Sequence, residues 1–325
     1  MKLLVTGGAG FIGTNFLIYM SNKYLNYKFI CLDNLSVKES NNNLEYLKKY
    51  KNIQFIKGDI TNEEFINDLF KKEKFDAVIN FAAEVAVDYS IENPNIFLKT
   101  NVLGTAILMN ACLKYKVDRY HQISTDEVYG DLPINSKKKY DETSVLRPSN
   151  PYAASKAAAD ILALSYYRTY GLKVTISRST NNYGPHQSFR GLIPLTIKNC
   201  TYNKSIPIFG TGNNIRDWIY VLDHARAIDL ILHNGKIGQI YNISGNSKRT
   251  NLYVVKKIIK IMNKDNNLIT YVKDRPGHDL MYSINSKKIE NELSWNRIYT
   301  FDKSIIYTIK WYEKNLILKW DFFNF

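Results

Sequence analysis

The chain has 325 residues, 45% of them apolar and 23% charged, which is the balance of an ordinary globular protein. These values exclude disordered and collagen-like classes, and the length allows one large domain or two modest ones. Lys and Arg number 44 against 30 Asp and Glu, giving a formal net charge of +14. Because the basic residues are scattered, with a single run of three at 137–139, the charge predicts no nucleic-acid partner.

The N-terminus and the cysteines indicate a cellular compartment. Met1-Lys2 leads straight into an apolar run and glycines, without the basic, apolar and small segments of an export signal. No uninterrupted apolar run approaches the roughly 18 residues that a membrane span requires. Cys31, Cys112 and Cys200 lie far apart, without a CxxC pair or metal-ligand spacing. We therefore expect a cytoplasmic protein with no membrane partner, metal site or disulfide.

The first half of the chain alternates short apolar runs with amphipathic stretches. The apolar runs predict strands at 2–6, 28–32, 53–57, 76–80, 119–124 and 173–178. The amphipathic stretches predict helices at 11–24, 63–72, 96–115 and 152–170. Strands that alternate with helices in this way predict an α/β fold, a doubly wound parallel sheet with helices on both faces.

After residue 178 the loops lengthen and Gly and Pro become frequent, as at Gly184-Pro185, Gly210-Thr211-Gly212 and Pro276-Gly277. This change predicts two units. Residues 1–178 would form the sheet domain, with some later segments returning to it, and 179–325 would form mainly a smaller mixed α/β lobe. In open α/β sheets the ligand lies outside the carboxyl ends of the strands, so we expect the site between the two units.

A glycine-rich turn follows the first strand and opens the first helix. Gly7, Gly10 and Gly13 lie within the eight residues 6–13. Glycines let backbone N–H groups approach a pyrophosphate, and the helix N-terminus adds a partial positive charge. Asp33 ends the second strand 20 residues after Gly13, where a carboxylate accepts hydrogen bonds from the ribose and repels a 2′-phosphate. The pattern predicts a Rossmann-type site for NAD rather than NADP, with Asp59 facing the adenine.

Tyr152 and Lys156 are four residues apart at the start of a predicted helix, so their side chains share one face. An ammonium near a phenol stabilises the phenolate, and a cationic nicotinamide ring would add to this effect. Tyr152 could then take the proton of a sugar alcohol as a hydride leaves for NAD.

Five further motifs are spread over nearly the whole chain. They read STDEVYG at 124–130, PSNPYAASK at 148–156, NNYGP at 181–185, IRDW at 215–218 and DRPGHD at 274–279. Together with the glycine turn, they resemble the extended short-chain dehydrogenase/reductase superfamily. Within it they resemble the nucleotide-sugar 4,6-dehydratases of the dTDP-glucose 4,6-dehydratase type.

The adjacent acids Asp126 and Glu127 distinguish a dehydratase from an enzyme that only moves a hydride. Once C4 of the sugar is a ketone, the hydrogen on C5 becomes acidic. Two carboxyls in opposite protonation states suit its removal and the departure of the C6 hydroxyl. The resemblance implies that Glu127 is the base and Asp126 the acid, and that Thr125 bonds the C4 oxygen.

The resemblance also implies binding residues. Those expected to bind NAD are Gly7, Gly10, Phe11, Ile12, Gly13, Asp33, Asn34, Asp59, Ile60, Phe81, Ala82, Ala83, Thr100, Tyr152, Lys156 and Asn182. Those expected at the nucleotide-sugar substrate are Val85, Thr125, Asn181, Arg190, Arg216, Asn242, Arg275 and His278. Of these, Arg216 and Arg275 would pair with phosphate oxygens.

The chain departs from the family pattern at three places. Val85 stands where the family has a substrate-contacting Ser, and Ala86 replaces a His. Arg190-Gly191 replaces a Glu-Lys pair that helps to hold the nucleotide, and the segment 34–38 lacks the usual Tyr-Ala after the ribose acid. These departures predict the same reaction on a different activated hexose, linked to GDP, UDP or CDP, or N-acetylated.

Two other functions remain open at this stage. A nucleotide-sugar 4-epimerase would keep Tyr152 and Lys156 but leave Asp126 and Glu127 idle. A non-catalytic NAD-binding protein would need none of the four. The resemblance further implies a homodimer formed through two long helices, for which 96–115 and 152–170 are long enough.

Overall fold

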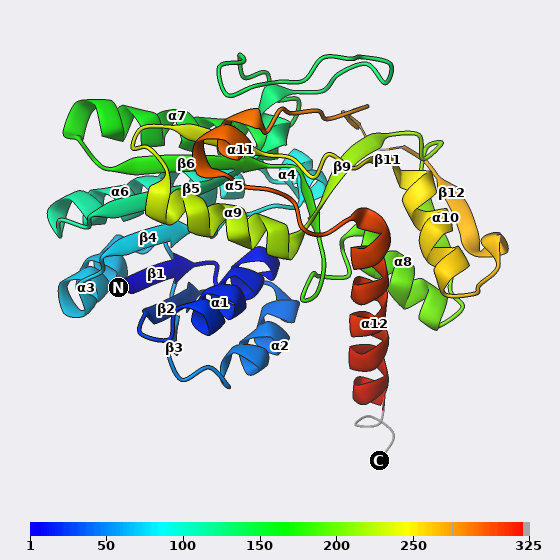
Figure 1. The fold of residues 1–325 in the computed structure, drawn as a ribbon, viewed down its shortest axis with the longest axis horizontal. Coiled ribbons are helices and arrows are strands. Elements are labelled where there is room, and N and C mark those ends of the chain that lie inside the picture. The colour runs from blue at the N-terminus through cyan, green and yellow to red at the C-terminus, as the bar shows by residue number, and fades with distance from the viewer. Residues whose placement is uncertain (275, 321–325) are drawn as a thin grey trace.

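A seven-stranded parallel sheet lies at the centre of the fold (Figure 1). The structure is a computed structural model that describes residues 1–274 and 276–320, with side chains described as far as Leu316. The strand order is β10-β6-β5-β4-β1-β2-β3. The strands are β1 (Lys2–Thr6), β2 (Lys28–Asp33), β3 (Ile53–Lys57), β4 (Ala77–Asn80), β5 (Arg119–Thr125), β6 (Val174–Ser179) and β10 (Ile240–Ile243). The Rossmann-type prediction is confirmed, and β10 is the strand that it did not locate.

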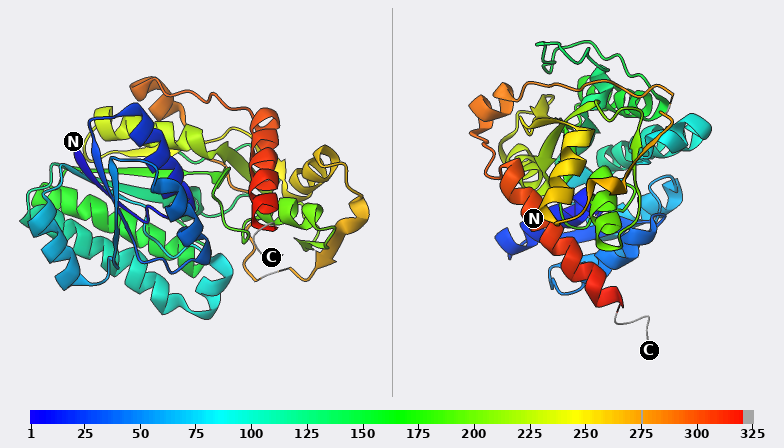
Figure 2. Two further views of the ribbon diagram at one scale, coloured as in Figure 1. Left: turned by 90° about the horizontal axis from the view of Figure 1, so that it is seen from below. Right: turned by 90° about the vertical axis from the view of Figure 1, so that its right-hand side faces the viewer.

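Helices cover both faces of this sheet (Figures 1 and 2). One face carries α1 (Phe11–Lys23), α2 (Lys38–Leu47) and α9 (Val221–Asn234), and the other carries α3 (Glu63–Glu73), α6 (Gly104–Lys114) and α7 (Pro151–Tyr170). Successive strand residues point to opposite faces, so Leu3 and Val5 pack on the α1 side while Leu4 packs on the α3 side. Burial on both faces explains why the strands read as continuous apolar runs.

The remaining elements form a smaller part beside the carboxyl ends of the strands (Figure 1). It contains the sheet β11-β9-β7 and the parallel pair β12-β8. These strands are β7 (Asn181–Tyr183), β8 (Ile206–Phe209), β9 (Ile215–Tyr220), β11 (Lys248–Thr250) and β12 (Ile269–Val272). The helices of this part are α8 (Leu192–Thr201), α10 (Asn251–Ile261), η3 (Asn266–Leu268) and α12 (Phe301–Trp320), whereas α11 (Lys287–Leu293) packs against β10 and α9 at the central sheet (Figure 1). The chain therefore passes back from this part to the sheet at α9 and β10.

The segment predicted as one helix at 96–115 is helical over 94–114 but changes geometry along its length. It follows α4 (Val87–Glu92) and consists of α5 (Pro94–Phe97), a π-helical turn η1 (Leu98–Leu103) and α6. Among the described residues, this stretch alone is long and apolar enough to cross a membrane, with a mean hydropathy of 1.5. Half of it is buried in the protein, where it packs against α3 and α7, so core packing accounts for the apolar character of that half.

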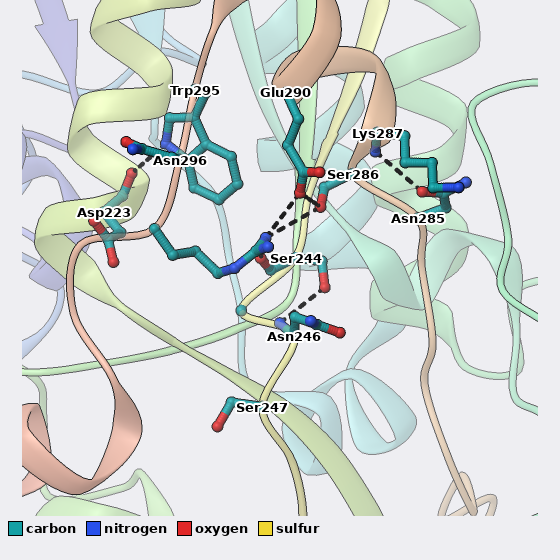
Figure 3. Close-up of polar contacts among 12 residues, drawn as sticks. Asp223, Ser244, Asn246, Ser247, Asn285, Ser286, Lys287, Glu290, Trp295 and Asn296 are labelled. Atoms are coloured by element: carbon teal, nitrogen blue, oxygen red, sulfur yellow. Dashed lines mark hydrogen bonds and ion pairs between the residues drawn. The ribbon is translucent and has the colours of Figure 1, made fainter.

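A polar cluster connects α11 to the segment after β10 (Figure 3). The Arg297 guanidinium donates to the Ser244 carbonyl (3.1 Å), the Ser286 hydroxyl (3.3 Å) and a Glu290 carboxylate oxygen (2.9 Å). Farther along the same segment, the buried Asp217 carboxylate of β9 accepts the Ser247 N–H at 2.6 Å. Arg297 thus holds one end of the segment between β10 and β11, and Asp217 holds the other. The position of the Asp217 carboxylate is fixed by the same contacts.

A second cluster joins α1 to α9. The buried carboxylate of Asp229 accepts hydrogen bonds from the Tyr19 and Tyr24 hydroxyls, each 2.9 Å, and from Lys23 Nζ at 2.6 Å. His233 completes the cluster at 2.9 Å. Burial opposes ionisation, but the hydrogen bonds from His233, Lys23 and the tyrosines outweigh it and lower the pKa of Asp229.

We expect Asp229→Asn to destabilise the fold by about 2 kcal/mol at neutral pH, because hydrogen bonds to a buried charge are lost. A lowered carboxyl pKa stabilises the fold above the unfolded-state pKa, and that stability is lost as the pH falls through the folded-state value. The difference in melting temperature between the variant and the parent should therefore shrink in acid. The exposed pair Lys48–Glu45 provides the control, and Glu45→Gln should leave the melting temperature nearly unchanged. Equal shifts for the two variants would contradict the expectation.

Candidate active site

A cavity of about 440 Å³ opens at the carboxyl ends of the parallel strands. It runs from the ends of β1 and β2 to the ends of β5 and β6, across the point where the strand order reverses between β1 and β4. This is where doubly wound sheets bind their ligands. All the residues predicted to bind NAD line it, as do Thr125, Asp126 and Glu127.

The glycine turn is packed too tightly for side chains. Gly7 has a φ of +62°, and a Cβ atom there would lie 2.7 Å from the Ala82 nitrogen. A Cβ on Gly13 would lie 2.4 Å from the Gly7 carbonyl oxygen. Gly10 is the N-cap of α1 and brings no capping side chain. No side chain therefore caps the N-terminus of α1 on the cavity side. The glycine turn and this helix end together form a glycine cradle, which fits a dinucleotide diphosphate.

Two acidic residues, Asp33 and Asp59, line the cavity beyond the glycine turn. Asp33 ends β2 and accepts the Ala9 N–H at 3.1 Å and the Leu35 N–H at 2.8 Å. Burial raises its pKa, although these backbone hydrogen bonds act in the opposite direction. Asp59 follows β3, where Thr61 and Asn34 bond its carboxylate. Both carboxylates are held in place by the protein and line the cavity, as the ribose and adenine contacts require.

The other end of the cavity holds the two adjacent acids. The Thr125 hydroxyl accepts the Glu127 N–H at 3.3 Å and so starts the short helix η2 (Asp126–Tyr129) directly after β5. Asp126 is buried, and its Oδ2 atom has no hydrogen-bond partner among the described residues. Burial, reinforced by the charges of Glu127 and Asp217, raises the pKa of Asp126 well above its usual range. This direction favours the protonated form of Asp126, the form that an acid in the elimination requires.

Tyr152 and Lys156 project from the first turns of α7. Asn150 caps this helix by accepting the Ala153 N–H at 2.9 Å, and Pro151 occupies its first position. Lys156 Nζ donates to the Ile123 carbonyl at 2.6 Å, and burial lowers its pKa to about 8. Burial and the charge of Glu127 raise the pKa of Tyr152. This direction is opposite to the stabilisation of the phenolate that the Tyr–Lys spacing predicts with NAD bound.

The predicted substrate residues divide into two groups. Val85 and Asn181 line the cavity, and Asn181 Oδ1 is buried without a partner within the described part of the chain. Arg190, Arg216 and His278 do not line it. Arg190 is exposed before α8, Arg216 is buried against Tyr282, and the His278 ring bonds Asp274 at 2.7 Å.

One predicted contact is corrected and another lies outside the structure. Asn242 is fully buried in β10, where its amide accepts the Tyr129 hydroxyl at 2.8 Å and donates to the Tyr140 carbonyl at 3.4 Å. Its polar atoms serve the packing of the sheet edge, so it cannot contact a substrate in the cavity. Arg275 lies outside the described residues.

Two asparagines that support the cavity carry no recognisable signal in the sequence: Asn43 lines the cavity, and Asn101 follows the lining residue Thr100. Asn43 of α2 donates to the carbonyls of Ala9 and His186, each at 3.1 Å, and so ties the glycine turn to the loop after β7. Asn101, in the π-helical turn η1, bonds both the N–H and the carbonyl of Glu84. Asn43 sits in a run of asparagines and Asn101 inside a helix pattern, so neither stands out until the fold brings the partners together.

Comparisons with known proteins agree with this geometry. The family model described as GDP-mannose 4,6 dehydratase matches residues 4–308. A dTDP-glucose 4,6-dehydratase from Haemophilus influenzae is 42% identical, covering 97% of this chain and 98% of the relative. The crystal structure of dTDP-glucose 4,6-dehydratase from Bacillus anthracis in complex with NAD has 43% identity and a TM-score of 0.90, covering 97% of each chain. The enzyme from Streptomyces venezuelae, solved with NAD bound, has 38% identity and a TM-score of 0.92, covering 98% of each chain. With a family match over almost its entire length, the chain belongs to the nucleotide-sugar 4,6-dehydratases.

Proposed function

We propose that the protein is an NAD-dependent nucleotide-sugar 4,6-dehydratase that converts an NDP-hexose into the NDP-4-keto-6-deoxy sugar. The observation that carries the proposal is the pair of carboxyls at the end of β5, where Asp126 is buried beside Glu127 with one oxygen that has no hydrogen-bond partner among the described residues. It lies in the same cavity as Tyr152, Lys156 and the glycine cradle. An epimerase needs no such acid–base pair, because it neither removes the C5 proton nor expels a hydroxyl.

The chain's own residues account for the proton movements. Tyr152 takes the proton of the C4 hydroxyl, and Thr125, at the end of β5, is placed to hold the C4 oxygen. Glu127 removes the C5 proton, and the electron pair of that bond is first delocalised into the C4 ketone as an enolate, from which the C5–C6 double bond forms as the C6 hydroxyl leaves. Asp126 gives its proton to the departing C6 hydroxyl, which leaves as water. When bound, NAD supplies a cationic ring that favours the Tyr152 phenolate, and it accepts a hydride from C4 that is later returned to C6.

Membership of the family does not identify which activated hexose this protein converts. The relatives' substrate, dTDP-glucose, is the first compound to test. The sequence departures favour another base or an N-acetylated hexose, and one of them has a structural correlate. Val85 lines the cavity with 61% of its surface exposed, where the family's hydroxyl contact is absent.

A substrate panel in D₂O tests the function. The purified protein with NAD is supplied with dTDP-, UDP-, CDP- and GDP-linked glucose and the corresponding N-acetylglucosamine compounds. We expect one compound to give a 4-keto-6-deoxy product with deuterium at C5. A C4-inverted product without deuterium would identify an epimerase. Bound NAD without turnover of any compound would favour a non-catalytic role.

The pH profile should report on Asp126. Because the elimination needs this carboxyl protonated, the rate should fall as the pH rises through its raised pKa. Asp217→Asn removes one of the charges that raise this pKa, so the alkaline limb of the profile should move to lower pH. Asp217 also accepts hydrogen bonds from the segment 244–247 on both carboxylate oxygens, and the single Asn oxygen keeps those made to one of them, so the melting temperature of the variant should be measured beside its pH profile. An alkaline limb that stays in place would contradict the assignment of this limb to Asp126.

We also infer a homodimer, supported by an apolar surface on the predicted pairing helices. Ile96, Leu98, Leu103 and Ile161 are exposed large side chains on α5, η1 and α7. Ile161→Asp should shift the protein from dimer to monomer in light-scattering measurements. Leu25→Asp, at an exposed site after α1, should leave the mass unchanged. A monomeric parent protein would refute the inference.

A further inference from the structure

The residue that contacts Glu127 from the opposite side of the site is Tyr282. Its hydroxyl lies 3.4 Å from Glu127 Oε2 and also donates to a carboxylate oxygen of Asp279 in a short hydrogen bond. The same oxygen of Asp279 accepts the Ser149 hydroxyl at 2.8 Å. Tyr282 and Asp279 are buried, whereas Ser149 is exposed. The four residues form a continuous polar chain from the base to the surface.

Several contacts fix this chain in place. The Arg216 guanidinium lies 4.5 Å from the centre of the Tyr282 ring and donates to the Asp279 carbonyl at 3.0 Å. The backbone on either side is held by the Ile215 N–H on the Leu280 carbonyl and by the Leu132 N–H on the Met281 carbonyl. Burial and the charge of Glu127 raise the pKa of Tyr282, so the phenol keeps its proton. The phenol thus places a single proton between the Glu127 and Asp279 carboxylates, donating it to one of them at a time.

We propose that Tyr282 positions the Glu127 carboxylate and, with Asp279, carries the proton taken from C5 to solvent. This proposal rests on the proposed dehydratase function. After the elimination, the proton on Glu127 moves to the Tyr282 oxygen while the Tyr282 proton moves to Asp279. Asp279 releases that proton to water beside Ser149. The reverse transfer returns a solvent proton to Glu127, which then protonates C5 as C6 is reduced, so no proton is gained or lost overall. The 3.4 Å contact is of the length that tightens when substrate is bound.

The isotope at C5 distinguishes a relay from a structural role. In D₂O the parent enzyme should place deuterium at C5, because the proton on Glu127 exchanges before it returns. Tyr282→Phe keeps the ring against Arg216 but removes the hydroxyl. We expect turnover to fall on the order of tenfold, the value of one hydrogen bond to a charged group. We also expect most of the product to retain the original C5 hydrogen.

Asp279→Asn separates the two parts of the proposal. Asn can still accept the Tyr282 hydroxyl, so Glu127 stays in position, but it cannot take the proton. The C5 hydrogen should again be retained, with a smaller loss of turnover than in Tyr282→Phe. Tyr241→Phe is the matched control, since it removes a buried phenol that bonds Glu292 rather than Glu127, and it should show full deuterium incorporation.

The outcomes separate this proposal from the function on which it rests. A parent enzyme that forms no dehydrated product would refute the dehydratase function itself. A parent enzyme that works, with full C5 deuterium in both Tyr282→Phe and Asp279→Asn, would overturn the relay and leave the function intact. Slower turnover with unchanged deuterium in both variants would reduce Tyr282 and Asp279 to a structural role.

Discussion

Tyr152→Phe should lower the formation of 4-keto-6-deoxy sugar by at least about a hundredfold, the lower end of what a positioned acid or base contributes. The phenol lies at the start of α7 in the active-site cavity, and in the proposed mechanism it removes the proton from the C4 hydroxyl. Without it, C4 is not oxidised, and the C5 hydrogen of the recovered substrate is never made acidic. Proton NMR of the mixture in D₂O should therefore show neither product nor deuterium at C5.

The matched control is a tyrosine on the same helix that is remote from the cavity. Tyr166 bonds Asn110 at 2.7 Å, and Tyr166→Phe should retain full activity. Binding of NAD, followed by calorimetry, should survive in both variants, because the glycine cradle and Asp33 are untouched. A Tyr152→Phe enzyme with the parent rate would remove Tyr152 from the proposed chemistry.

Much of the sheet and of the cofactor side could be predicted because the signals are local. A strand buried on both faces must be apolar throughout, and this is visible at β1, β2 and β5. The glycine turn is readable because Gly7 has a positive φ and Gly13 has no room for a Cβ atom. The ribose-binding role of Asp33 could be predicted because its place at the end of β2 fixes its distance from the glycine turn. Each inference needs only the residues of one strand–turn–helix unit.

Long-range contacts set the parts that could not be predicted. The family resemblance implies a substrate role for Asn242, but its strand is the seventh of the sheet and its amide is bonded to Tyr129 and Tyr140. Burial is the main cause of the raised pKa of Asp126, and part of it comes from the charge of Asp217, which lies 91 positions away in the sequence. Asp217 in turn is held by a segment that Arg297 anchors. The family motifs therefore identify the reacting side chains, whereas distant residues such as Asp217 influence the pKa of those side chains.

Asp126→Asn should separate the two halves of the reaction. The amide has the shape of the buried acid but cannot protonate the departing hydroxyl, so product formation should fall by about a hundredfold to a thousandfold. Oxidation at C4 and proton removal by Glu127 do not need Asp126, and the substrate recovered from D₂O should therefore gain deuterium at C5. Asp118→Asn, at an exposed carboxylate paired with Lys173, should change neither quantity. If Asp126→Asn abolished both product formation and C5 exchange, Asp126 would be acting before the elimination. An unchanged product rate would transfer the role of the acid to another group.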